Sequence, residues 1–168
     1  WNYIQIGNSA SLATATLDTC VIRWGGSSSF PSSNPALYIY SGTATLRSCD
    51  ISSSKNYGVA VYDQGTAIIE NSNISQCDWP ASYFAQGDLI FVGANNLGGN
   101  THNGINILFS SSSGAFTLDT VSVPYVFTYA FTVNSGSTIN VATGSILKFT
   151  NYNGLTINGA LVASASQG

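Results

Sequence analysis

The chain has 168 residues, of which 7% are charged and 44% hydrophobic, and its formal net charge is −3. An average soluble domain carries about 25% charged residues, so this surface must consist mainly of hydroxyl and amide groups. The apolar content excludes a disordered chain. Four basic residues cannot form a nucleic-acid-binding face, and no apolar run reaches the roughly 18 residues that span a bilayer. The composition favours a single β-rich domain that is extracellular or on the cell surface.

Short segments in which apolar and polar residues alternate recur along the chain and predict β-strands. Five of them share the order apolar, any, any, small, any, apolar, namely 17–22, 46–51, 69–74, 92–97 and 118–123. A second series lies between them and contains 37–40, 58–62 and 104–108. Ile51, Ile74 and Leu97 follow one another at intervals of 23 residues. A period of this length, with equivalent residues stacked in columns, predicts a parallel β-solenoid.

The last third of the chain has a different rhythm. Apolar or aromatic residues occupy seven consecutive odd positions from Val121 to Val133, which predicts one long half-buried strand or two strands joined through Pro124. Shorter turns follow. We therefore expect one all-β domain over residues 1–168, with coils of about 23 residues over 1–114 and coils of shorter period over 115–168. The whole would form about seven coils with no significant helix.

The two ends of the chain carry the most specific motifs. The chain opens with Trp1-Asn2-Tyr3-Ile4, and it closes with Ile139-Asn140-Val141, Lys148-Phe149, Leu155-Thr156-Ile157 and Leu161. These motifs resemble the right-handed parallel β-helix repeats of secreted and cell-surface bacterial proteins, within the pectin-lyase-like superfamily. The resemblance implies a right-handed solenoid and a module that recurs in tandem. Because the chain starts at Trp1 without an initiator methionine, we interpret it as a mature fragment or a piece of a longer protein.

Three charged residues fall in one outward column on successive coils. Asp18, Arg47 and Glu70 alternate in sign, as neighbouring charges on stacked strands should. We interpret them as a structural ion ladder, which Gly93 is expected to end. Because no two carboxylates share a position on adjacent coils, the sequence predicts neither the carboxylate pair of a glycosidase nor a calcium cluster. We assign no catalytic, metal-binding or cofactor-binding residue.

Cysteines occupy an inward column. Cys20 and Cys49 share it, and its continuation on later coils is Ser72, Asn95 and Val121. Adjacent coils bring two such sulfurs close enough for a disulfide, but buried free thiols pack equally well. The sequence leaves both states open. Cys77 is expected to be a plain buried thiol or to bond another subunit.

Aromatic residues and two loop residues complete the candidates. Tyr38, Tyr40 and Tyr62 face outward, where they could bind sugar rings, but we favour an aromatic ladder that stabilises adjacent coils. His102 is the only histidine, and without a recognisable partner it is interpreted as a surface residue. Asn73 begins a glycosylation sequon and is equally explained as a turn residue in a stacked ladder.

We therefore predict a structural extracellular module, not an enzyme, that assembles end to end or in tandem into a surface fibre, sheath or adhesin stalk. Neither end of the sequence has an amphipathic helix or a charge-rich segment to cover a terminal coil. The expected partners are further copies of the chain, without a cofactor, nucleic acid or membrane insertion. One alternative is a polysaccharide lyase or glycoside hydrolase that uses Asp63, Asp88 or Asp119. The other is a glycan-binding module that uses the three tyrosines.

Overall fold

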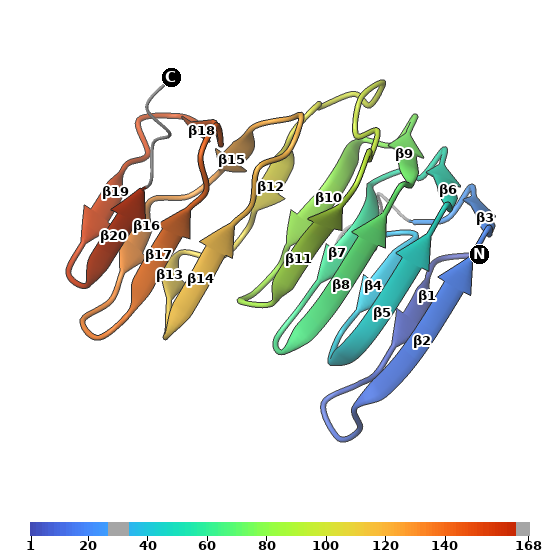
Figure 1. Cartoon of the computed structure of the whole chain (residues 1–168), viewed down its shortest axis with the longest axis horizontal. Coiled ribbons are helices and arrows are strands. Elements are labelled where there is room, and N and C mark those ends of the chain that lie inside the picture. Colours follow the sequence, from blue (N-terminus) through green and yellow to red (C-terminus); the bar gives the residue numbers. More distant parts are fainter. Residues whose placement is uncertain (27–33, 164–168) are drawn as a thin grey trace.

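The structure, a computed structural model, describes residues 1–26 and 34–163; residues 27–33 and 164–168 of the predicted domain lie outside this description. The chain winds into a solenoid whose longest sheet runs along one side (Figure 1). In spatial order, this long sheet contains β1 (Ile4–Ile6), β4 (Leu37–Ile39), β7 (Tyr57–Val61), β10 (Trp79–Tyr83), β12 (Ile105–Ile107), β15 (Tyr125–Phe127) and β18 (Leu147–Phe149).

Four shorter sheets complete the coils. In the first coils, one contains β2 (Ala13–Asp18), β5 (Gly42–Arg47), β8 (Gly65–Glu70) and β11 (Asp88–Val92), and the other contains β3 (Val21–Arg23), β6 (Asp50–Ser52) and β9 (Asn73–Ser75). In the last coils, one contains β13 (Ser111–Ser112), β16 (Phe131–Val133) and β19 (Leu155–Ile157), and the other contains β14 (Ala115–Leu118), β17 (Thr138–Val141) and β20 (Ala160–Ala163).

The predicted all-β parallel solenoid is confirmed for the described residues, which contain no helix. It has about six turns, whereas about seven coils were expected, because the seven strands of the long sheet enclose six turns between them. Neighbouring strands pair in parallel, and their register places apolar residues of one coil beside apolar residues of the next. Val59 pairs with Leu37 and with Ala81, and all three are fully buried.

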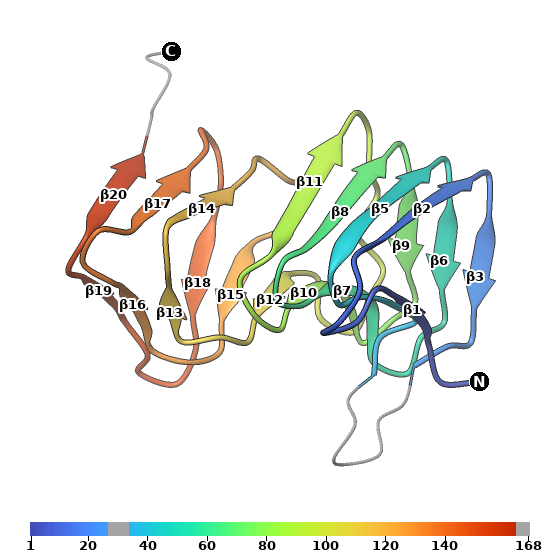
Figure 2. The same ribbon diagram turned by 90° about the horizontal axis from the view of Figure 1, so that it is seen from below.

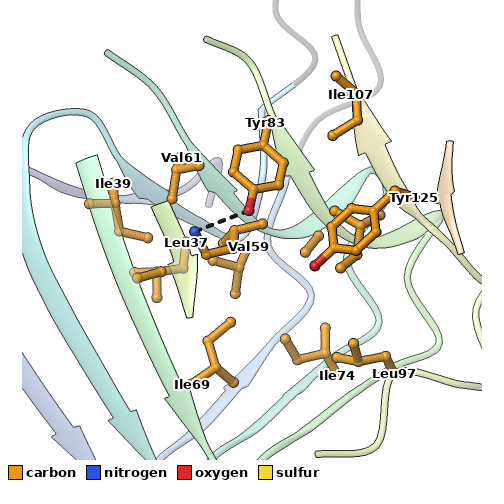
Figure 3. Close-up of a cluster of buried hydrophobic side chains, with 14 of the residues drawn as sticks. Leu37, Ile39, Val59, Val61, Ile69, Ile74, Tyr83, Leu97, Ile107 and Tyr125 are labelled. Atoms are coloured by element: carbon orange, nitrogen blue, oxygen red, sulfur yellow. Dashed lines mark hydrogen bonds between the residues drawn. The ribbon is translucent and has the colours of Figure 1, made fainter. Parts of the chain in front are cut away.

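The core consists of the inward columns of these sheets. Val59, Val61 and Ile69 lie beside Ile74 and Leu97 inside the solenoid (Figure 3). Aliphatic side chains dominate here because every second residue of a strand points inward and meets its equivalents on the coils above and below.

Two corners of the first coils use left-handed backbone, a feature that the sequence analysis missed. At the first corner, Thr19, Ser48 and Asn71 have φ of 54°, 50° and 47°, and Gly93 follows at 70°. At the second corner, Trp24, Ser53 and Gln76 have φ of 57°, 59° and 56°, and Gly99 follows at 74°. A left-handed non-glycine residue costs about 1 kcal/mol. Stacking the same conformation on successive coils lets each corner hydrogen-bond to the next.

The coil changes shape midway along the solenoid. β10 pairs with β12 in the long sheet. β11 and β14 follow each other in one row of strands along the solenoid, but they belong to separate sheets (Figures 1 and 2). We call the boundary between β11 and β14 the seam. Beyond the seam, β15 and β16 are two strands of different sheets. The expectation of two joined strands therefore fits better than that of one long strand. The chain bends at residues 128–130, not at Pro124, because Pro124 precedes β15.

Candidate functional site

The two terminal coils expose side chains that point into the solenoid. Ile4 is 42% exposed at one end, and Phe149, Ile157 and Leu161 are 38%, 39% and 46% exposed at the other. Their register partners on the neighbouring coils, Leu37, Phe127, Val133 and Ile139, are all fully buried. The exposure therefore arises because no further coil covers these faces among the described residues.

The terminal strands also have one unpaired edge each. β1, β2 and β3 form one set of edges, and β18, β19 and β20 form the other. At the first end, Trp1, Val21 and Trp24 line a hollow next to Ile4 and Ile22. A row of free backbone donors and acceptors beside apolar side chains is able to accept further parallel strands.

The predicted ion ladder is in register, and one of its two pairings is an ion pair. Asp18 pairs with Arg47, and Arg47 with Glu70, on β2, β5 and β8. Arg47 Nε lies 2.9 Å from Glu70 Oε2. The Asp18 carboxylate instead accepts from the Thr19 hydroxyl at 3.1 Å. Exposed ion pairs of this kind contribute little to stability.

The predicted end of this ladder is wrong by one residue. Val92, not Gly93, pairs with Glu70 on β8, and Val92 is 45% exposed. Phe91 takes the inward place next to Ile69 that the repeat assigned to Val92. The repeat was misread because Asn96 still bridges to Asn73, so this coil has one extra residue at its corner and a register that changes there.

A second polar ladder lies on the outer face of β3, β6 and β9, and the sequence had suggested only its member Asn73. Arg23 Nη2 donates to Asp50 Oδ2 at 2.6 Å, and Asn73 Nδ2 donates to Asp50 Oδ1 at 2.8 Å. Asn96 Nδ2 continues the series by donating to Asn73 Oδ1 at 2.7 Å. The hydrogen bond from Arg23 is the main reason why the pKa of Asp50 is lowered. The 23-residue spacing of Asp50, Asn73 and Asn96 was the available signal.

This ladder bears on the sequon at Asn73. Its side-chain amide also donates to Ser75 Oγ at 3.1 Å, so the nitrogen that would carry a glycan is engaged by two partners. Asn73 belongs to the stacked ladder that was one of its two interpretations, but it lies in strand β9 and not in a turn.

Three free thiols lie at the corners of the described coils. Cys49 and Cys77 are each 2% exposed, and Cys20 is half-buried. The column that begins with Cys20 and Cys49 continues through Ser72 and Asn95. The Ser72 hydroxyl accepts from Cys49 N–H at 3.0 Å, and the Asn95 side chain accepts from Ser72 N–H at 2.8 Å. The expected last member, Val121, lines a hollow with Asn95.

The three predicted tyrosines pack on one another. The rings of Tyr40 and Tyr62 lie 4.8 Å apart, and Tyr38 contacts both at 5.8 and 6.2 Å. Tyr3 and Phe84 extend the cluster around Tyr38. Partial burial is the main cause that raises the pKa of Tyr38. These rings contact each other across adjacent coils, as an aromatic ladder does.

His102 is exposed, as interpreted from the sequence, but it has a partner that the sequence did not reveal. Its Nδ1 lies 3.0 Å from Asp78 Oδ1, and its ring stacks on Trp79 at a centroid distance of 4.5 Å. Asp78 and His102 are one coil apart, which hid the pair from local reading of the sequence. A carboxylate orients an imidazole in this way in hydrolases, but a nucleophile is also needed there. Within residues 1–26 and 34–163, no group of three or more His, Cys, Asp or Glu side chains could hold a metal ion.

The seam brings together two of the three carboxylates considered for an enzyme. Burial is the main cause that raises the pKa of Asp119, and nearby Asp88 adds to it, whereas the Phe91 backbone acts in the opposite direction. Asp63 lies elsewhere, beside Asn8 in the turn after β7. Side chains close the seam where strand pairing is missing. The Gln86 amide donates to Ser113 O and accepts from Ser113 N–H, and these two bonds join the two sides of the seam. On the β11 side, Tyr83 OH accepts from Leu89 N–H at 3.2 Å; Figure 3 draws this bond as a dashed line from Tyr83.

Comparison with protein families gives one match, which covers nearly the whole chain. The family described as right handed beta helix region matches residues 2–166. Comparison with curated proteins and with solved structures gives no match. No helix in the described part of the chain is long and apolar enough to cross a membrane. The family match agrees with the parallel coils seen here, and the chain belongs to the right-handed β-helix family.

Proposed function

We propose that this β-helix is a structural extracellular module that joins end to end, or in tandem, to further coils of the same kind in a surface fibre, sheath or stalk. One observation carries the proposal. Both terminal coils present inward-pointing apolar side chains and unpaired parallel strand edges at the same faces. A hydroxyl- and amide-rich surface with 7% charged residues supports an extracellular location.

The energetics favour a cover made of similar coils. Burying a Leu, Ile or Phe side chain fully contributes roughly 1.5–3 kcal/mol, so each of the four half-exposed end residues has about 1 kcal/mol still to gain. Parallel strands that arrive in register would satisfy the free backbone groups at the same time. The long sheet would then continue with Leu147 and Phe149 stacked on Ile4 and Ile6 of the next unit, since all four point inward from this sheet.

Assembly in solution tests the proposal. We expect purified protein to form filaments as its concentration rises, seen by electron microscopy and by sedimentation velocity across a dilution series. The axial repeat should be about 34 Å, because seven strands stack at about 4.8 Å each. Ile4→Lys and Leu161→Lys place a charge on the two end faces and should each abolish the filaments.

Ile90→Lys is the matched control. Ile90 is 37% exposed on β11, so the same change puts a charge on the side of the solenoid and should leave assembly intact. Circular dichroism verifies that all three variants keep their β-structure. Monomers at every concentration, or filaments that form equally well in the Ile4 and Leu161 variants, would overturn the proposal.

A further inference from the structure

We propose that Cys20 and Cys49 are a redox-active pair that forms a disulfide between the first two coils. The inference does not depend on the proposed function. It rests on the backbone that carries the two thiols, on their different exposure, and on the absence of a cysteine beside Cys77 among the described residues.

The backbone places the two residues in equivalent positions on adjacent coils. Asp18 pairs with Arg47 just before the corner, and Val21 pairs with Asp50 just after it. Asp50 N–H also donates to Cys20 O at 2.9 Å. Stacked positions on neighbouring strands lie about 4.8 Å apart, which is inside the Cα–Cα range of about 4.4–6.8 Å for disulfides.

The side chains point to the same region. The Cys49 thiol donates to Leu17 O at 3.4 Å, and the Cys20 thiol donates to the next carbonyl along the chain, that of Asp18, at 3.4 Å. The Cys49 sulfur therefore lies against the first coil, next to the corner that carries Cys20. Joining the two sulfurs therefore requires side-chain rotation and no rearrangement of the coils.

The difference in exposure sets the order of the reaction with a low-molecular-weight disulfide as the oxidant. The half-buried Cys20 thiol loses its proton, and its thiolate attacks the oxidant, forming a mixed disulfide and releasing one thiolate. The Cys49 thiol then loses its proton, and its thiolate attacks the Cys20 sulfur, releasing the second thiolate. The two released thiolates take up the two protons. The protein loses two electrons, and the oxidant is reduced to two thiols.

Cys49 is suited to the second step and not to the first. It is 2% exposed, and burial raises the pKa of its thiol, so an external oxidant meets little Cys49 thiolate. Cys77 occupies the other corner. Its N–H donates to Asn100 Oδ1, and its sulfur donates to Ser75 O. Because its stacked neighbours carry no thiol, Cys77 should stay reduced.

Trypsin separates the three cysteines and makes the test direct. Cleavage after Arg23, Arg47 and Lys55 leaves Cys20 in the peptide that ends at Arg23, Cys49 in 48–55, and Cys77 in a later peptide. Reduced protein is incubated with glutathione disulfide, blocked with N-ethylmaleimide in denaturant, digested and analysed by mass spectrometry. We expect the Cys20 and Cys49 peptides to be joined, with a loss of roughly 2 Da relative to the two free thiols. The melting temperature should rise by roughly 10 °C and return when the bond is reduced.

Two variants make the result specific. Cys49→Ser should stop the reaction at the first step and leave Cys20 as a glutathione adduct, whereas Cys77→Ser should still form the Cys20–Cys49 bridge. The proposal fails if wild-type protein accumulates the Cys20 adduct without an internal bridge. It also fails if Cys77 is found in the bridge, or if only disulfides between molecules form.

Discussion

Two corner asparagines share three equivalent hydrogen bonds but differ in burial, and this predicts different effects on stability. Asn100 accepts from Cys77 N–H at 2.9 Å and donates to Ile74 O and Leu97 O at 3.0 and 2.8 Å. Asn95 accepts from Ser72 N–H at 2.8 Å and donates to Ile69 O and Val92 O, both at 3.0 Å. Asn100 is 9% exposed, whereas Asn95 is half-exposed. The perturbation is alanine at each position.

The expected loss in the free energy of unfolding depends on whether water can replace the hydrogen bonds that each mutation removes. A buried hydrogen bond contributes about 1 kcal/mol net, and its loss costs more when the partner stays buried and unsatisfied. Asn100→Ala removes the three shared bonds and a longer one to Gly98 O at 3.4 Å, all at a buried corner, and should lower the free energy of unfolding by about 3 kcal/mol or more. Asn95→Ala removes three bonds at a corner that water can reach, so we expect a loss of about 1–2 kcal/mol.

Urea denaturation followed by circular dichroism measures both values, with Asn2→Ala at an exposed position as the control. The control should change stability by less than about 0.5 kcal/mol. Asn100→Asp adds an internal check. It keeps an acceptor but turns a buried carboxylate toward two carbonyl oxygens, so it should be at least as destabilising as alanine at neutral pH. Equal losses for the two alanine variants, or a larger loss at Asn95, would show that burial does not decide the cost of losing these hydrogen bonds.

Three further predictions concern the outer ladder and the seam. The pKa of Asp50 is lowered, so its stabilising contribution is present above the ordinary carboxyl pKa near 4 and is lost as pH falls through the lowered value. Asp50→Asn should make the free energy of unfolding fall less steeply at acidic pH, and an unchanged pH dependence would contradict this. The pKa of Asp119 is raised, so the folded state holds its proton more tightly and stability should decline as pH rises from the ordinary value to the raised one; Asp119→Asn should remove this decline, which urea melts at a series of pH values would detect. Gln86→Ala removes the amide that bonds Ser113, so hydrogen exchange at Ser113 N–H should speed up while that at Ile139 N–H, which lies within β17, stays slow; equal protection of Ser113 in both proteins would count against a seam closed by Gln86.

Much of the fold was predictable from the sequence because a solenoid repeats its own environment. Each coil of about 23 residues must place apolar side chains where the previous coil has them, so the columns of Leu37 and Val59 and of Ile51 and Ile74 are visible as spacing. The predicted register of Asp18, Arg47 and Glu70 follows from the same regularity. The prediction failed at Val92, where one extra corner residue changed the register inside a coil without changing the spacing of the coils on either side.

The candidate sites were less predictable, because their members are joined by side-chain reach across coils. The Asp78–His102, Arg23–Asp50 and Gln86–Ser113 contacts each connect residues 24 to 27 positions apart. Nothing in the local sequence distinguishes these polar residues from other surface residues. The left-handed corners were also missed, since Thr19, Ser48 and Gln76 are not residues that favour that conformation.

The order of residues along the chain is enough to predict a parallel β-solenoid with stacked apolar columns, because the period and the alternation of its strands are local properties that repeat coil by coil. Three properties emerge only in the folded chain: which polar groups meet, where the coil changes shape between β11 and β14, and the half-exposure of the inward residues at both ends. Those properties depend on which side chains lie within hydrogen-bonding distance on neighbouring coils and on whether a further coil covers each face. The position of a residue along the chain does not encode either one.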